Sequence, residues 1–130
     1  MAISSNFDKL DTQSLKFLLK GELLKQQEGR QQDFMKFVKT VWPGFIEGKH
    51  HKIYAEKLNR IASGELKRLI VNMPPRHTKS EFASHLFPAF YMGRHPKAKL
   101  IQTTHTGELA IRFGRKAKNM IESEEYEKVF

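Results

Sequence analysis

The chain has 130 residues, the length of one ordinary domain, and carries 23 Lys and Arg against 14 Asp and Glu for a net charge of +9. It contains no cysteine, which excludes disulfide frameworks, thiolate metal sites and cysteine nucleophiles. No apolar stretch approaches the roughly 18 residues of a membrane span, and the first residues lack the pattern of a signal peptide. We therefore expect a protein without membrane contact or export signal.

Residues 1–33 predict a polar helical lead-in. Ser14 is a candidate N-cap, and the apolar residues from Leu15 to Leu24 have helical spacing that Gly21 interrupts. Such a stripe indicates packing against a core or an interface.

Two more helices are predicted before residue 65. Apolar residues recur at i, i+3, i+4 and i+7 from Phe34, directly after Asp33, and the pair at 43–44 (PG) ends this helix. A third helix is expected over about 51–62, ended by the Ser-Gly pair at 63–64.

The pattern changes after this third helix. Residues 69–73 (LIVNM) form a short apolar run typical of a buried parallel strand, and a loop over 74–78 follows. A helical stretch is expected over about 79–91, in which Pro88 predicts a kink or a break.

A second strand is expected over 99–104, and Thr106 is the candidate cap of a helix that runs to about Ile121. The four glutamates that follow, at 122–127, indicate a solvated tail. Strand, loop, helix, strand and helix in this order predict an α/β fold, whose parallel sheet starts with a right-handed βαβ unit.

The segment MPPRHTKS at 73–80 matches the phosphate-loop pattern G-x-x-x-x-G-K-[ST] at its Lys-Ser end and in its strand-to-helix setting. Met73 and Thr78 stand at the two glycine positions. If the position of Thr78 requires a positive φ, a β-branched residue there costs about 1–3 kcal/mol. The alternative is a proline-rich connection with a surface lysine.

A nucleoside triphosphate needs backbone N–H donors, a cation near its β- and γ-phosphates and a hydroxyl on Mg²⁺. Because the two prolines have no N–H, the donors are expected from His77 to Ser80. Lys79 is the candidate phosphate lysine, Ser80 the candidate magnesium ligand, and Arg76 a second cation able to reach the γ-phosphate.

With its flanks (RLIVNMPPRHTKSE at 68–81), this loop resembles the Walker A region of tailed-phage terminase large subunits. The resemblance continues through FPAFYMGRHP at 87–96, THTGELA at 104–110 and FGR at 113–115, with WP at 42–43 and HHK at 50–52 upstream. It covers roughly residues 40–121.

The resemblance implies the ATP-binding part of a viral DNA-packaging motor, which uses ATP and Mg²⁺ to drive double-stranded DNA into a procapsid. It implies a ring homo-oligomer on the portal protein, a small terminase subunit as partner, and the host cytoplasm as location. Residues 34–130 would be the N-terminal portion of a P-loop ATPase domain. Lys79 becomes the Walker A lysine, Ser80 the magnesium ligand, Arg76 the loop arginine, and His51 a contact near the adenine.

Two features depart from this family. Thr78 replaces the usual glycine, and no Walker B strand with its Asp-Glu pair or nuclease acidic cluster is found before Phe130. We therefore expect an incomplete ATPase domain that holds a nucleotide but hydrolyses it poorly by itself.

Residues 67–121 contain 11 basic and two acidic residues, so the positive charge is concentrated around the loop. Arg112, Arg115 and Lys116 have offsets that place them on one helix face, a candidate contact for DNA or a neighbouring subunit. Two other readings stay open: a helicase-like P-loop ATPase, and a non-enzymatic basic module that binds DNA or protein.

Overall fold

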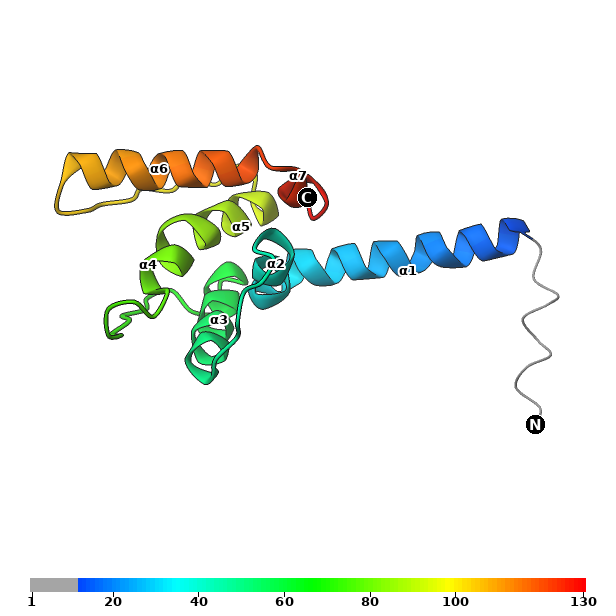
Figure 1. Ribbon diagram of the computed structural model, residues 1–130, viewed down its shortest axis with the longest axis horizontal. Coiled ribbons are helices and arrows are strands. Elements are labelled where there is room, and N and C mark those ends of the chain that lie inside the picture. The colour runs from blue at the N-terminus through cyan, green and yellow to red at the C-terminus, as the bar shows by residue number, and fades with distance from the viewer. Residues whose placement is uncertain (1–11) are drawn as a thin grey trace.

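The computed structural model describes residues 12–130, and over that range it consists of helices and connecting segments (Figure 1). The elements are α1 (Thr12–Gln32), α2 (Phe34–Val41), α3 (Lys49–Ala62), α4 (Lys79–Glu81), the π-helix η1 (Phe82–Leu86), α5 (Phe87–Arg94), α6 (Gly107–Ile121) and α7 (Glu124–Glu127). No helix in this range has the length and apolarity that crossing a membrane requires.

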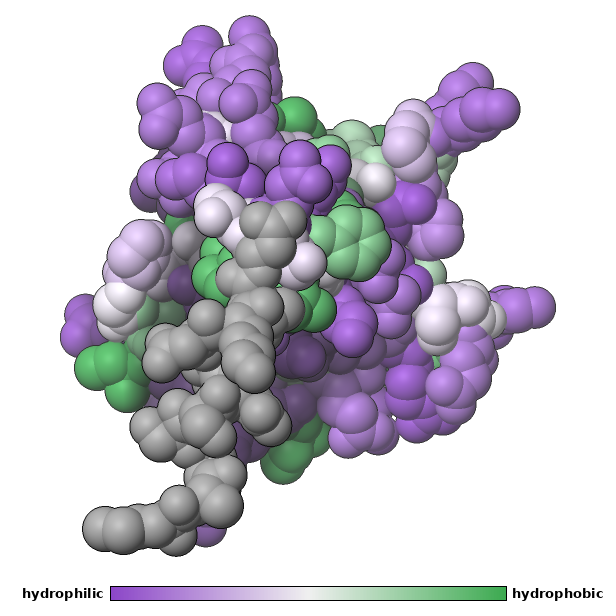
Figure 2. All heavy atoms as spheres, turned by 90° about the vertical axis from the view of Figure 1, so that its right-hand side faces the viewer, coloured by the Kyte–Doolittle hydropathy of each residue, from purple (hydrophilic) through white to green (hydrophobic). Residues whose placement is uncertain are grey.

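The predicted first helix, α1, is a long rod that projects from the rest of the molecule (Figure 1). It begins at Thr12, two residues before the predicted cap, and continues through Gly21 without a break. None of its residues is buried, so its apolar side chains do not contribute to the core of the described chain. The face seen from the α1 side is mainly hydrophilic, with small hydrophobic patches between hydrophilic residues (Figure 2).

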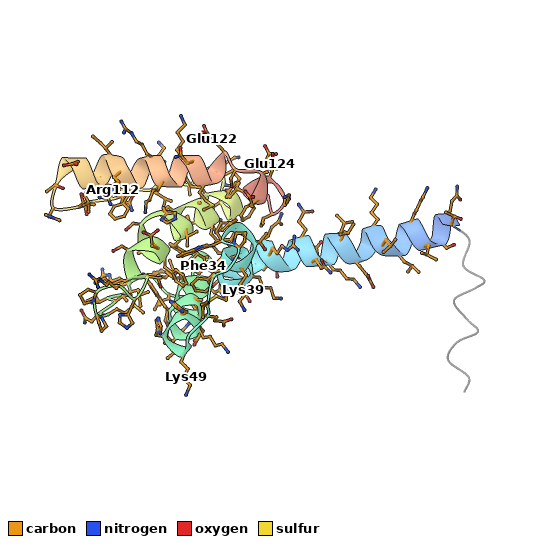
Figure 3. All side chains as sticks on the ribbon, in the orientation of Figure 1. Phe34, Lys39, Lys49, Arg112, Glu122 and Glu124 are labelled. Atoms are coloured by element: carbon orange, nitrogen blue, oxygen red, sulfur yellow. The ribbon has the colours of Figure 1, made fainter. Side chains whose placement is uncertain are left out.

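The core lies between α2, α3, η1, α5 and the C-terminal residues. Phe34, at the start of α2, is fully buried and occupies the centre of the body (Figure 3). Its ring meets those of Phe82 and Phe90 edge-on, at centroid distances of 5.3 and 5.4 Å. Aromatic contacts of this kind add to the free energy of apolar burial and join the three elements into one core.

Capping residues place α2 where the sequence predicts it. The Asp33 side chain accepts a hydrogen bond from the Met35 N–H at 2.9 Å, and the Asn59 side chain of α3 accepts one from the Phe34 N–H at 2.8 Å. Both N–H groups belong to the first turn of α2, where backbone N–H groups have no acceptor within the helix. The third predicted helix is also confirmed, because α3 ends at Ala62 and Gly64 follows with a φ of 81°.

The helical stretch after residue 78 is not divided at Pro88, because α4, η1 and α5 follow one another without a non-helical residue, and the residues before Pro88 form the π-helix η1. Pro88 cannot donate to the Ser84 carbonyl four residues earlier. The side-chain amide of Gln102 donates to that carbonyl instead, at 2.7 Å. This bond ties the connection between α5 and α6 to the π-helix.

The predicted α/β fold with a P-loop parallel sheet is wrong for the described residues, which contain no strand. Residues 69–73 and 99–104 are neither helical nor paired in a ladder. Leu69 and Val71 are half-buried against the core, but Ile70 is 88% exposed and Ile101 is 92% exposed. A parallel strand needs neighbours for its backbone and cover on both faces, and nothing in residues 12–130 supplies them here.

The C-terminal residues are also packed more closely than a solvated tail. Tyr126 and Val129 are buried, and the Tyr126 hydroxyl donates to the Ala89 carbonyl of α5 at 2.9 Å. The side-chain amide of Gln31 donates to the Val129 carbonyl at 2.6 Å, which fastens the end of α1 to this segment. The glutamate side chains around Tyr126 are exposed or half-exposed, as expected for a solvated tail, but the segment that carries them is packed against the core.

Candidate functional site

The predicted phosphate-loop residues lie together around a surface concavity of about 450 Å³, lined by residues 73–81. The last two residues of the 73–80 loop, Lys79 and Ser80, are also the first two of α4, and the helical path continues from there through η1 into α5. Another concavity, of about 620 Å³, lies between α5 and α6, has a largely apolar lining and includes none of the predicted site residues. The loop is therefore where the candidate chemistry is concentrated.

The backbone of the 73–80 loop adopts an unusual conformation. Arg76 and Thr78 have φ values of 64° and 58°, and they are the two non-glycine residues with positive φ in residues 12–130. Because His77 between them does not share this sign, left-handed and ordinary conformations alternate. Alternation of this type turns successive backbone N–H groups toward one side and forms an anion-binding concavity. The condition stated for Thr78 is therefore met, since its φ is positive.

The side chain of Thr78 is held by His51. The two atoms His51 Nε2 and Thr78 Oγ1 are 2.6 Å apart, and Thr78 Oγ1 also donates to the His77 carbonyl at 2.6 Å. The other ring nitrogen, His51 Nδ1, accepts a hydrogen bond from the Gly48 N–H at 2.9 Å. With Nδ1 as acceptor, the proton of neutral His51 is on Nε2, so His51 donates to Thr78.

Burial is the main reason why the pKa of His51 lies below its ordinary value, and the neighbouring His50 lowers it further. Glu47 acts in the opposite direction. The neutral form agrees with the hydrogen bond that Nδ1 accepts. His51, for which the resemblance implies a contact near the adenine, lies beside the loop with both ring nitrogens engaged within the protein.

The three residues predicted to meet the phosphates and the metal, Arg76, Lys79 and Ser80, are all exposed at the concavity. Neither Arg76 nor Lys79 forms an ion pair with another residue in the described part of the chain. Two cations and a hydroxyl thus surround backbone donors, a set suited to a phosphate group and, through Ser80, to a magnesium ion that phosphate oxygens also hold.

The predicted basic face of α6 is present, and Arg112, Arg115 and Lys116 line one depression of its surface. The two arginines are exposed, whereas Lys116 pairs with Glu81 at 3.0 Å. Arg112 lies toward the start of α6, and the acidic Glu122 lies beyond its other end (Figure 3). Of the three predicted residues, the two arginines are thus exposed to solvent, whereas Lys116 forms an ion pair with a residue of α4.

Sequence reasoning missed the group formed by Glu81, His85 and Lys116. His85 Nδ1 lies 3.2 Å from a Glu81 oxygen, but the geometry makes no hydrogen bond, and this buried nitrogen has no other partner among the described residues. Burial is the main cause that lowers the pKa of His85. The i,i+4 spacing of Glu81 and His85 was a usable signal, while Lys116 is too distant in sequence to suggest the contact.

Comparison with known proteins finds no matching family model, no matching curated protein and no matching solved structure.

Proposed function

We propose that this chain binds ATP with Mg²⁺ through its 73–80 loop, as the ATP-binding part of a DNA-packaging motor of the terminase large-subunit type. The observation that carries the proposal is the pair of left-handed residues, Arg76 and Thr78, directly before the helix that starts at the exposed Lys79. A backbone turned in this way is rare outside glycine and leaves N–H groups available to a phosphate.

Each exposed side chain has a distinct role in this proposal. Lys79 approaches the β- and γ-phosphates from the first turn of α4, where backbone N–H groups also favour an anion. The Ser80 hydroxyl joins the coordination of Mg²⁺, and Arg76 contacts the γ-phosphate and responds to its loss. His51 contributes through Thr78 and makes no direct contact with the nucleotide.

Binding of a fluorescent ATP analogue with Mg²⁺ tests the proposal. Replacing Lys79 by alanine is expected to weaken the affinity by about tenfold or more, because a hydrogen bond from a charged group contributes about 1.5–3 kcal/mol. Lys97→Ala is the matched control, since it removes an exposed lysine outside the loop. Equal affinity of the Lys79→Ala variant and the unchanged protein would show that the loop does not bind the phosphates.

Double-stranded DNA is the proposed macromolecular partner, and the two open arginines of α6 support it. We expect weak, sequence-independent binding that falls steeply with salt, because contacts to DNA phosphates release counterions. Replacing both Arg112 and Arg115 by alanine is expected to reduce the slope of log K against log salt by about 2. Binding that does not depend on salt, or a salt slope that this double change leaves the same, would contradict a DNA role for the face. The portal protein, the small subunit and a ring of copies remain proposals from the resemblance.

A basic DNA-binding module without nucleotide chemistry is the second candidate, favoured by the same two arginines. It predicts DNA binding by the Lys79→Ala variant and no ATP binding by the unchanged protein. A helicase-like ATPase would share the loop, so the Lys79→Ala variant does not distinguish it from a packaging motor.

A further inference from the structure

Thr78 occupies a backbone conformation that its own side chain disfavours. In the left-handed region the Cβ of an L-residue approaches the following carbonyl, and a β-branched side chain has few rotamers that relieve this contact. Thr78 nevertheless has a φ of 58°. Contacts from outside the loop must therefore compensate for the strain.

The compensating contact comes from the first turn of α3. His51 is 7% exposed, and its ring is packed against those of Phe45 and Phe82 at centroid distances of 4.8 and 5.4 Å. Its Nδ1 accepts from the Gly48 N–H at 2.9 Å, which fixes the ring orientation and leaves the Nε2 proton to face Thr78 Oγ1. The histidine is thus a rigid donor whose direction is set before it meets the loop.

The hydrogen bonds continue from His51 into the loop backbone. Thr78 Oγ1 accepts from His51 Nε2 and donates to the His77 carbonyl, so both ends of its hydroxyl are used. The hydroxyl therefore cannot turn without breaking one of the two bonds. A glycine at this position would need no such restraint, because it adopts positive φ freely.

We propose that His51 is a positioning residue for the nucleotide site: its Nε2–H holds Thr78 in the left-handed conformation that turns the backbone of the 73–80 loop toward phosphate. The part of this inference that concerns ATP rests on the proposed function. The part that concerns the order of the loop stands by itself and has its own measurement.

The test is a double-mutant cycle between His51 and Thr78 on the full chain. Two quantities are measured for the unchanged protein, His51→Ala, Thr78→Gly and the double variant: the affinity for a fluorescent ATP analogue with Mg²⁺, and the rate of tryptic cleavage after Arg76. His51→Ala is expected to weaken binding and accelerate cleavage by about tenfold when Thr78 is present. With glycine at position 78, the same change is expected to alter both quantities by less than about twofold.

A purely structural role of His51 predicts a different pattern, because loss of its packing would act equally in both backgrounds. Equal effects of His51→Ala with threonine and with glycine at position 78 would overturn the proposal. His51→Gln provides a second variant, since its amide can donate to Thr78, and it is expected to restore most of the protection against cleavage. If no protein in the set binds the analogue, the proposed function fails while the cleavage rates still decide the role of His51.

Discussion

Replacing Thr78 by alanine and by glycine separates two opposing contributions at the centre of the 73–80 loop. Alanine keeps a Cβ in the left-handed region, where φ is 58°, but loses the hydroxyl that His51 contacts at 2.6 Å. Glycine loses the same hydroxyl and also relieves the strain. The difference between the two variants therefore reports the strain alone, apart from the greater freedom of glycine in the unfolded chain.

The contacts set the expected magnitudes. Leaving the buried His51 Nε2 without a partner costs about 1–3 kcal/mol, so Thr78→Ala is expected to lower the free energy of unfolding by this amount. Left-handed strain at a residue with a Cβ costs about 1–2 kcal/mol, and the entropy of glycine offsets about 0.5–1 kcal/mol of its relief. At the midpoints of these ranges, Thr78→Gly is therefore expected to be more stable than Thr78→Ala by about 0.75 kcal/mol.

Urea unfolding followed by circular dichroism measures these differences, with the slope against urea compared to detect changes in the unfolded state. Glu56, exposed on α3, provides the matched control pair, Glu56→Ala and Glu56→Gly. There the order is expected to reverse, because glycine in a helix interior is about 1 kcal/mol less stable than alanine. A Thr78→Gly variant no more stable than Thr78→Ala would show that position 78 carries no left-handed strain.

Two other substitutions test the packing and the titration of the core. Gly93→Ala places a Cβ 2.6 Å from the Phe130 ring and is expected to lower the free energy of unfolding by about 1–3 kcal/mol, whereas Gly114→Ala meets nothing within 4 Å and is expected to raise it by about 0.5–1 kcal/mol. Similar effects of both in thermal or urea unfolding would contradict the packing at Gly93. Because burial lowers the pKa of His85, the unfolded chain takes up a proton first as the pH falls, so stability is lost below about pH 6.5. His85→Leu is expected to reduce the loss of stability between about pH 7 and pH 5 in unfolding curves recorded across that range, and a loss as large as that of the unchanged protein would contradict this role of His85.

The helices were largely predictable because their signals are local. The periodic apolar residues of α2 begin directly after Asp33, which caps the helix as expected, and Thr106 caps α6 by accepting from the Leu109 N–H at 3.3 Å. Caps and periodicity act within one or two turns, so they can be recognised without knowledge of the tertiary contacts. The predicted division of the helix at Pro88 did not occur, because α5 continues from the π-helix η1 without a non-helical residue.

The two predicted strands were wrong because a strand depends on partners elsewhere in the chain. The apolar run at 69–73 has the composition of a buried strand, yet Ile70 remains 88% exposed in the described structure. Composition indicates what a segment favours, but a sheet forms only where a second segment accepts its backbone hydrogen bonds. The same limit applies to α1, whose leucines have helical spacing while none of its residues is buried.

The candidate site shows most clearly which features the sequence determined and which depended on the tertiary structure. The order of residues from Arg76 to Ser80 was enough to predict the cations, the hydroxyl and the difficulty at Thr78, because these depend on residue type and on the backbone of one loop. Only the tertiary structure brings His51 to Thr78 across 27 positions and Lys116 to Glu81 across 35. Such contacts are decided by how helices pack around the shared core, and packing depends on the whole set of apolar side chains, which no short stretch of sequence contains.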